Sequence, residues 1–150
     1  MKDTQTAGEG KNETIHRFKC KVWAVYSGSG EAIISKSRLS FWGGFDPKTG
    51  LVVDRYNDLY QKSIAGKIVV MLSTKGSSGT SGMLALAQRA DNAPAGMIHV
   101  EIDPMAVLGC LATRTPLVSL SGADPYEVIH DGDWVEINAE KEEVVVTRGE

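Results

Sequence analysis

The segment that decides the fold reads KIVVML at 67–72, STKGSSGTSG at 73–82 and MLALAQRA at 83–90, and GMIHVEI follows at 96–102. The first of these is a nearly continuous apolar run, which is typical of a strand that is covered on both faces. The third has good helix propensity throughout, and the last is a second apolar run. This order predicts a βαβ unit in which a right-handed connection joins two parallel strands.

The chain on either side of this unit predicts more strands and one more helix. Asp103-Pro104 has the residue types of a helix N-cap and first helical position, so we expect a short helix to about Ala112. Alternating patterns and short apolar runs predict strands at 18–25, 31–34, 116–120, 134–137 and 143–147, the last two as a hairpin. The expected fold class is mixed α/β, with the βαβ unit in the centre and β-hairpins at the periphery.

The composition limits the class of protein. The chain has 150 residues, 42% of them hydrophobic and 23% charged, and a formal net charge of -3. This length fits one compact domain, which we expect at 15–150 after a flexible N-terminal tail at 1–14. The acidic balance argues against nucleic-acid binding, and no apolar run approaches the roughly 18 residues of a membrane span. With no leader-like start and two distant cysteines, a cytoplasmic protein is expected.

The glycine- and hydroxyl-rich segment Gly76–Gly82 has the strongest chemical signal, because it joins a buried strand to a helix start. The first amides of a helix lack partners within it, and the macrodipole adds about half a positive charge there. Glycines let the backbone approach a ligand. The segment therefore favours a site for a carboxylate, a phosphate or a developing oxyanion. It matches neither a nucleotide P-loop nor a nucleophile elbow, and the alternative is that these residues only cap the helix.

Three other features are candidates for a site. The carboxylates of Asp46, Asp54 and Asp58 could polarise a substrate, although such residues more commonly form turns. The cluster FWGGF at 41–45 could cover an edge of the core or contact a partner subunit. His99 lies in the second apolar run, where a packed or hydrogen-bonded histidine is commoner than a catalyst. The histidines and cysteines do not have the spacing of metal ligands.

Four blocks of the sequence occur together in a known family. They are LSFWGGFDPKTG at 39–50, SIAGKIVV at 63–70, GSS at 76–78 and APA at 93–95. In this order and spacing, over roughly residues 22–120, the chain resembles the aconitase X swivel domain. The resemblance implies a swivelling β/β/α domain that is the small subunit of a dehydratase and is active only with a large catalytic subunit. It implies a small hydroxy acid as substrate, with cis-3-hydroxy-L-proline preferred and phosphomevalonate as the alternative.

The resemblance also implies roles for particular residues. Ser77, the first serine of the Gly-Ser-Ser, would be the catalytic base. The residues expected to bind substrate are Lys75, Gly76, Ser78, Gly79, Thr80 and Ser81. A nearby site loop would contain Gly43, Gly44, Asp46 and Asp54. An iron or iron–sulfur centre would belong to the large subunit, so this chain would hold no metal or cofactor.

The chain departs from the family pattern at Asn57, Asp58, Gln61 and Lys75. Lys75 stands where arginine is usual, which replaces a bidentate anion clamp by a point charge. A non-catalytic binding or regulatory module with the same fold is therefore an alternative. A phosphoryl-carrier swivel domain is a weaker one, because such a carrier needs a histidine near the helix start and Gly76–Gly82 contains none.

Overall fold

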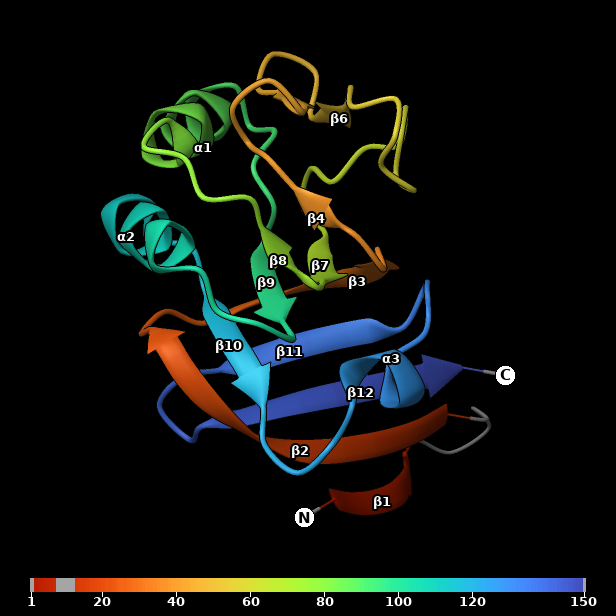
Figure 1. The fold of residues 1–150 in the computed structure, drawn as a ribbon. Helices are drawn as coiled ribbons and strands as arrows, with labels where there is room; N and C mark the ends of the chain where they lie inside the picture. The colour runs from red at the N-terminus through yellow and green to blue at the C-terminus, as the bar shows by residue number, and fades with distance from the viewer. Residues whose placement is uncertain (1, 8–12, 150) are drawn as a thin grey trace.

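The computed structural model describes residues 2–7 and 13–149 (Figure 1). In chain order the elements are β1 (Lys2–Ala7), β2 (Glu13–Ala24), β3 (Gly28–Ile34), β4 (Arg38–Leu39), β5 (Phe45–Asp46), β6 (Leu51–Val52), β7 (Ile68–Met71), β8 (Ser73–Thr74), α1 (Thr80–Arg89), β9 (Gly96–His99), α2 (Pro104–Thr113), β10 (Leu117–Leu120), α3 (Pro125–Val128), β11 (Trp134–Asn138) and β12 (Glu143–Gly149). None of the helices in this described part of the chain has the length and apolar character needed to cross a membrane.

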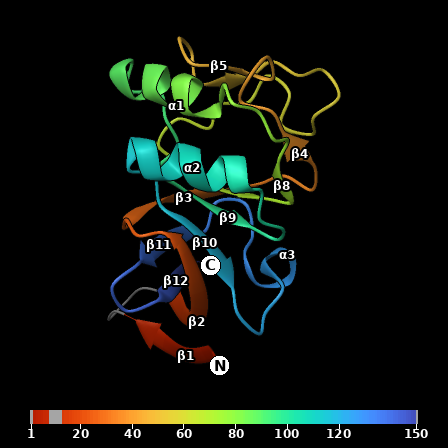
Figure 2. The same ribbon diagram turned by 60° about the vertical axis from the view of Figure 1, so that its left-hand side comes forward.

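The βαβ unit predicted from the sequence is present. β7 and β9 are parallel neighbours, with Ile68 opposite Gly96 and Met71 opposite His99. Every residue of both strands is buried. Helices α1 and α2 lie together over one side of the parallel strands, and β11 and β12 lie on the other side (Figures 1 and 2). The predicted mixed α/β fold is confirmed, and so is the hairpin of β11 and β12.

The strands form a sheet that closes on itself. Its order is β1-β2-β10-β9-β7-β3-β11-β12, and β12 also pairs with β2. β2 takes part in three pairings because it is 12 residues long. Its first half pairs with both β1 and β12, and its second half pairs with β10. The parallel strands β3, β7, β9 and β10 therefore form one side of a ring that the antiparallel strands β2, β11 and β12 complete.

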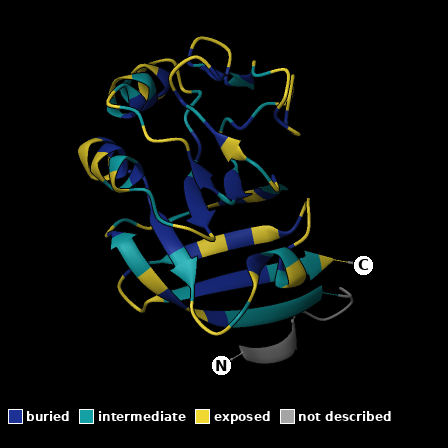
Figure 3. Cartoon of the chain, in the orientation of Figure 1, coloured by how far each residue is buried: buried dark blue, intermediate teal, exposed yellow. Residues whose placement is uncertain are grey.

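The apolar side chains are buried in two clusters, one on each face of the parallel strands. Val69 and Met97 face the helices and pack with Leu84 of α1. Val70 and Ile98 face the interior of the ring. This alternation follows from the two-residue period of a strand. Figure 3 shows β9 in the colour of buried residues, whereas α1 and α2 carry exposed residues on their outer faces.

Two segments differ from the sequence-based expectation. Residues 1–14 were expected to be a flexible tail, but Lys2–Ala7 pairs antiparallel with β2, and Glu13-Thr14 begins β2. Residues 1 and 8–12 lie outside the described residues. A polar segment forms a strand here because β2 presents an edge of backbone donors and acceptors. Helix α3 was not expected, although Asp124-Pro125 repeats the N-cap pattern of Asp103-Pro104.

Candidate functional site

The Gly76–Gly82 turn leaves the sheet at a fixed position. β8 pairs in parallel with β4, and the Lys75 amide continues this ladder by donating to the Leu39 carbonyl at 3.0 Å. The residues that follow run to the start of α1 along the surface of the domain. Those that remain wholly or partly accessible to solvent are Lys75, Gly76, Ser77, Ser78, Gly79 and Ser81. The turn is therefore open to a ligand.

Ser77 lies at the helix start with its hydroxyl oxygen next to a donor. Its Oγ accepts a hydrogen bond from the Gly79 amide at 3.1 Å, and its carbonyl accepts one from the Thr80 amide at 3.2 Å. The N-cap residue of α1 is Gly79, which has no side-chain cap. Among the described residues, the amides of Ser81 and Gly82 donate to no acceptor. The start of α1 thus keeps free donors and the positive end of its dipole close to Ser77.

Thr80 turns away from this group. Its side chain is 1% exposed, and its Oγ1 has no hydrogen-bond partner within the described parts of the chain. Its methyl group packs against α2, since a Cβ added at Gly109 would lie 3.0 Å from Thr80 Cγ2. A ligand on the exposed turn does not reach this hydroxyl. The substrate-binding role expected for Thr80 therefore does not fit the structure.

The aromatic cluster at 41–45 divides between the core and the surface. Phe41 and Phe45 are buried and meet edge to face, with ring centroids 5.3 Å apart. Between them the chain turns at Gly43, whose φ of +87° suits glycine. Trp42 remains 65% exposed. The phenylalanines therefore cover the core, whereas contact of the cluster with a partner subunit stays a prediction for the accessible tryptophan.

Trp42 brings this loop against the turn. A Cβ added at Gly79 would lie 2.9 Å from Cε3 of the indole, so the ring packs directly on the glycine. Surface hollows flank the tryptophan, one lined also by Asp46 and Met83 and the other by Gly44 and Asp54. The structure thus places Trp42 against the serine-rich turn, and the residues of the predicted site loop line the hollows around the tryptophan; neither hollow is lined by a residue of Gly76–Gly82.

The two carboxylates of this loop are engaged in local structure. Asp46 Oδ1 accepts a hydrogen bond from the Lys48 amide, and Asp54 Oδ1 accepts one from the Tyr56 amide, both at 2.9 Å. Contacts to an amide two residues on are characteristic of aspartates that form turns. The geometry therefore favours the turn-forming interpretation of both residues over direct contact with a substrate.

Asn57 and Asp58, where the chain departs from the family pattern, form hydrogen bonds to β4 and to the segment before it. Asn57 is buried and donates to a backbone carbonyl of β4 at 3.1 Å. Asp58 accepts hydrogen bonds from the hydroxyls of Ser35 and Ser37 at 2.6 and 2.9 Å and from the Lys36 amide at 2.8 Å. Burial alone would raise the pKa of Asp58, but these hydrogen bonds outweigh it and lower the pKa. Both side chains therefore have a structural role.

A carboxylate lies beneath the turn, and the sequence identified it only as a helix cap. Asp103 is the N-cap of α2, as predicted, and its Oδ1 accepts from the Met105 amide at 3.0 Å. Its Oδ2 accepts from the Thr74 hydroxyl at 2.9 Å. A Cβ added at Gly76 would lie 3.2 Å from Oδ2 and 3.3 Å from Oδ1. The cap could be recognised from Asp-Pro, but the contact with the turn depends on how α2 packs against β8.

His99 is the packed histidine that the sequence favours. It is 0% exposed, and neither ring nitrogen has a hydrogen-bond partner in the parts of the chain that the structure describes. Burial lowers the pKa of His99 to about 4, against a smaller opposite effect of the Asp103 charge. His99 is therefore uncharged near neutral pH and is too deeply buried to contact a substrate.

Metal ligation and thiol chemistry have no candidate residues in the described structure. No three or more His, Cys, Asp or Glu side chains among residues 2–7 and 13–149 gather in a way that could hold a metal ion. Both cysteines are buried and unpaired. Burial, with smaller contributions from Glu142 and Glu143, raises the pKa of Cys20 to about 11, and burial raises the pKa of Cys110 to about 12. The described residues therefore do not fit an iron or iron–sulfur centre.

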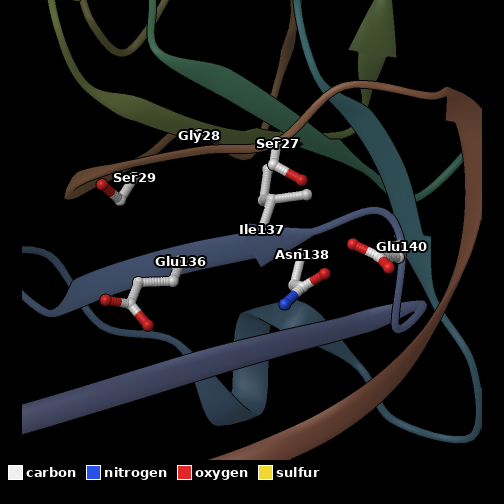
Figure 4. Close-up of a pocket in the computed structure, with 7 residues that line it drawn as sticks. All are labelled: Ser27, Gly28, Ser29, Glu136, Ile137, Asn138 and Glu140. Carbon is white, nitrogen blue, oxygen red and sulfur yellow. The ribbon is translucent and has the colours of Figure 1, made fainter.

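A further hollow lies at the edge formed by β3 and β11 (Figure 4). It is lined by Ser27, Gly28, Ser29, Glu136, Ile137, Asn138 and Glu140. Two carboxylates and no basic side chain line it, so it is unsuited to an anionic substrate. It includes no residue of the serine-rich turn.

Comparison with known proteins agrees with the sequence resemblance. The aconitase X swivel domain family matches residues 17–146. The chain is 37% identical over 122 residues to the phosphomevalonate dehydratase small subunit of Methanosarcina mazei, covering 81% of this chain and 85% of that protein. It is 36% identical over 117 residues to the protein of the same name from Pyrococcus abyssi, covering 78% and 88%.

Solved structures show the same fold. The crystal structure of Thermococcus kodakaraensis aconitase X in its holo-form matches with a TM-score of 0.78 and 32% identity, covering 87% of this chain and 97% of that chain. The solution structure of a UPF0107 protein matches with a TM-score of 0.76 and 30% identity, covering 85% and 96%. On the extent of the family match and of these similarities, the chain belongs to the aconitase X swivel domain family.

Proposed function

We propose that this chain is the small subunit of an aconitase X-type dehydratase that removes water from phosphomevalonate, with Ser77 as the catalytic base. The observation that carries the proposal is the position of Ser77. The residue is partly accessible at the N-terminus of α1, and the Gly79 amide donates to its Oγ at 3.1 Å.

Elimination of water from a hydroxy acid needs a base that takes a proton from carbon. A serine is such a base only as an alkoxide, which hydrogen-bond donors and a positive field stabilise. The Gly79 amide supplies one donor to Ser77, and the start of α1 supplies the field. Ser78 forms none of the hydrogen bonds found in the described residues. The proposal therefore assigns proton transfer to Ser77 and substrate binding to Ser78.

The rest of the turn suits an anionic substrate. Lys75 is an exposed cation two residues before Ser77, and a lysine binds phosphate as a point charge. The backbone of Gly76 and Gly79 and the Ser81 hydroxyl lie along the same accessible turn. The names of the relatives favour phosphomevalonate over cis-3-hydroxy-L-proline, the substrate that the sequence first suggested.

A large catalytic subunit would cover the turn and complete the site. The turn of this chain is open to water, and an electrostatic site is much stronger where water is excluded. Trp42, exposed on the Gly79 side of the turn, would contact that partner. Because the described residues do not fit an iron or iron–sulfur centre, we place that centre in the large subunit and derive no step through it here.

The proposed function is tested by reconstitution. The chain is purified alone and with its large subunit, and loss of phosphomevalonate is followed by ³¹P NMR, with cis-3-hydroxy-L-proline assayed in parallel. We expect turnover of phosphomevalonate by the complex and none by either subunit alone. Activity of this chain by itself would contradict the division of roles, and turnover of the proline derivative alone would replace the proposed substrate.

The role of Ser77 is tested in the same complex. Ser77→Ala is expected to lower kcat by about 10²–10⁴-fold, the usual contribution of a general base, with assembly unchanged in gel filtration. Ser78→Ala is the matched variant, and it is expected to raise KM with a much smaller effect on kcat. Equal losses of kcat in both variants would remove Ser77 as the base. An assembled complex with neither activity would favour the non-catalytic binding or regulatory module.

A further inference from the structure

We infer that Asp103 is a positioning residue for the Ser77 turn, because its carboxylate fixes the two residues from which that turn begins. The significance of this contact for catalysis rests on the proposed function. The contact itself is a feature of the fold.

Asp103 holds the chain on the N-terminal side of Ser77. The Thr74 hydroxyl, which is buried at the end of β8, donates to Asp103 Oδ2 at 2.9 Å. The Gly76 backbone, directly before Ser77, packs against both carboxylate oxygens. On its C-terminal side Ser77 is held by the hydrogen bond from the Gly79 amide. Contacts at the start of α2 (Asp103) and at the start of α1 (Gly79) thus hold the chain on both sides of Ser77.

The glycine at position 76 is explained by this contact. Its φ lies outside the left-handed region, so the backbone conformation does not itself require glycine. An added Cβ would lie only 3.2 and 3.3 Å from the carboxylate oxygens of Asp103. A methyl group at Gly76 would therefore require the carboxylate or the turn to shift by a few tenths of an ångström.

The chain supplies a matched control for the capping role of Asp103. Asp124 caps α3 in the same way, with Pro125 at the first helical position and its Oδ1 accepting from the Tyr126 amide at 2.9 Å. In the described structure its carboxylate accepts no other hydrogen bond. Alanine at either position removes a cap, but only alanine at Asp103 releases Thr74 and the turn.

The first test measures kcat and KM separately in the complex with the large subunit. Asp103→Ala is expected to lower kcat by about tenfold or more, since small displacements of a reacting group have effects of this order, and to raise KM by a smaller factor because Ser78 lies on the same turn. Thr74→Val, which leaves the cap in place, is expected to lower kcat in the same direction. Asp103→Asn should recover most of the rate, because asparagine caps helices equally well and can still bond Thr74. Asp124→Ala is expected to keep kcat, and equal effects of the two alanine variants would overturn the inference.

The contact with Gly76 is tested by a double variant. Gly76→Ala is expected to lower kcat, and this loss should shrink when Asp103→Ala removes the carboxylate that the new methyl group meets. Gly149→Ala is the control, because Gly149 lies in β12, outside the turn, and a Cβ there would meet no described atom within 4 Å. Independent, fully multiplicative effects of Gly76→Ala and Asp103→Ala would contradict the contact.

A second measurement does not depend on activity. The full chain is studied by ¹⁵N relaxation without its partner. Amide order parameters of Ser77 and Ser78 should be about 0.85 in the wild type and in Asp124→Ala. They should fall below about 0.6 in Asp103→Ala. Unchanged values in Asp103→Ala would overturn the positioning role. If the wild-type complex turns over neither substrate, the proposed function fails, while the order parameters still decide whether Asp103 fixes the turn.

Discussion

The burial of His99 predicts a specific dependence of stability on pH. The folded chain holds this histidine with a pKa of about 4, and its value when unfolded is 6.5. Between these values the unfolded chain binds a proton on His99 that the folded chain does not bind. His99 therefore has no effect on stability well above pH 6.5. Its protonation in the unfolded chain lowers stability as the pH decreases towards 4, and below pH 4 the effect of His99 no longer changes with pH.

The size of the effect follows from the two pKa values. Each pKa unit between the folded and unfolded states corresponds to about 1.36 kcal/mol, so the difference between 6.5 and about 4 gives a total loss of about 3 kcal/mol. About 2–3 kcal/mol of this is lost between roughly pH 7.5 and roughly pH 4.5. The contribution of Asp58 lies below this window, because its lowered pKa affects stability only below its ordinary value of 3.8.

The assay is urea unfolding followed by circular dichroism at about pH 7.5 and about pH 4.5. His99→Leu places an apolar side chain in the buried position and cannot titrate, so its loss of stability should be smaller than that of the wild type by about 2–3 kcal/mol. His130 is exposed, and His130→Gln should lose as much stability as the wild type. If His99→Leu and the wild type lose stability in parallel, the argument from burial is wrong.

Two pairs of variants test packing and charge. Gly79→Ala should destabilise the fold by about 1 kcal/mol in urea unfolding, since the added methyl group meets the Trp42 ring at 2.9 Å. Adding Trp42→Ala to this variant should remove the loss of stability. A loss that persists would contradict the contact. Asp133 is 4% exposed and accepts from Arg148 at 2.7 and 2.9 Å, so Asp133→Ala should cost about 2–3 kcal/mol and lower Tm by roughly 5–10 °C. Glu143→Ala breaks a partly exposed ion pair in which the two atoms lie 3.4 Å apart, and it should cost less than about 1 kcal/mol. Similar Tm shifts in Asp133→Ala and Glu143→Ala would show that burial is not what makes the Asp133 pair strong.

The parts of the fold that were predicted from the sequence are those set by local pattern. The apolar run at 67–72 and the Asp103-Pro104 cap each depend on neighbouring residues, and both appear as expected. The strand Lys2–Ala7 has no such pattern, because its pairing with an edge of β2 is between backbone groups. The closure of the sheet between β2 and β12 was missed for the same reason, since pairing between distant segments leaves little local signal.

The candidate site shows the same division. Glycine and serine at a helix start predicted the open turn, and Ser77 lies there with a donor at its oxygen. The inward direction of Thr80 could not be read from the sequence, because it depends on the packing of α1 against Gly109 of α2. The contact of Asp103 with the turn likewise arises only when α2 and β8 come together.

The pairing of β2 with β12 also bears on how the chain is made. It joins residues near the two ends of the sequence, from Glu13 opposite Gly149 to Lys19 opposite Glu143, and such non-local pairing slows folding. A nascent chain on the ribosome can assemble the βαβ unit early, but the first half of β2 lacks one neighbour until β12 has been synthesised. During that interval an unpaired strand edge is exposed, and chaperones would be expected to bind there.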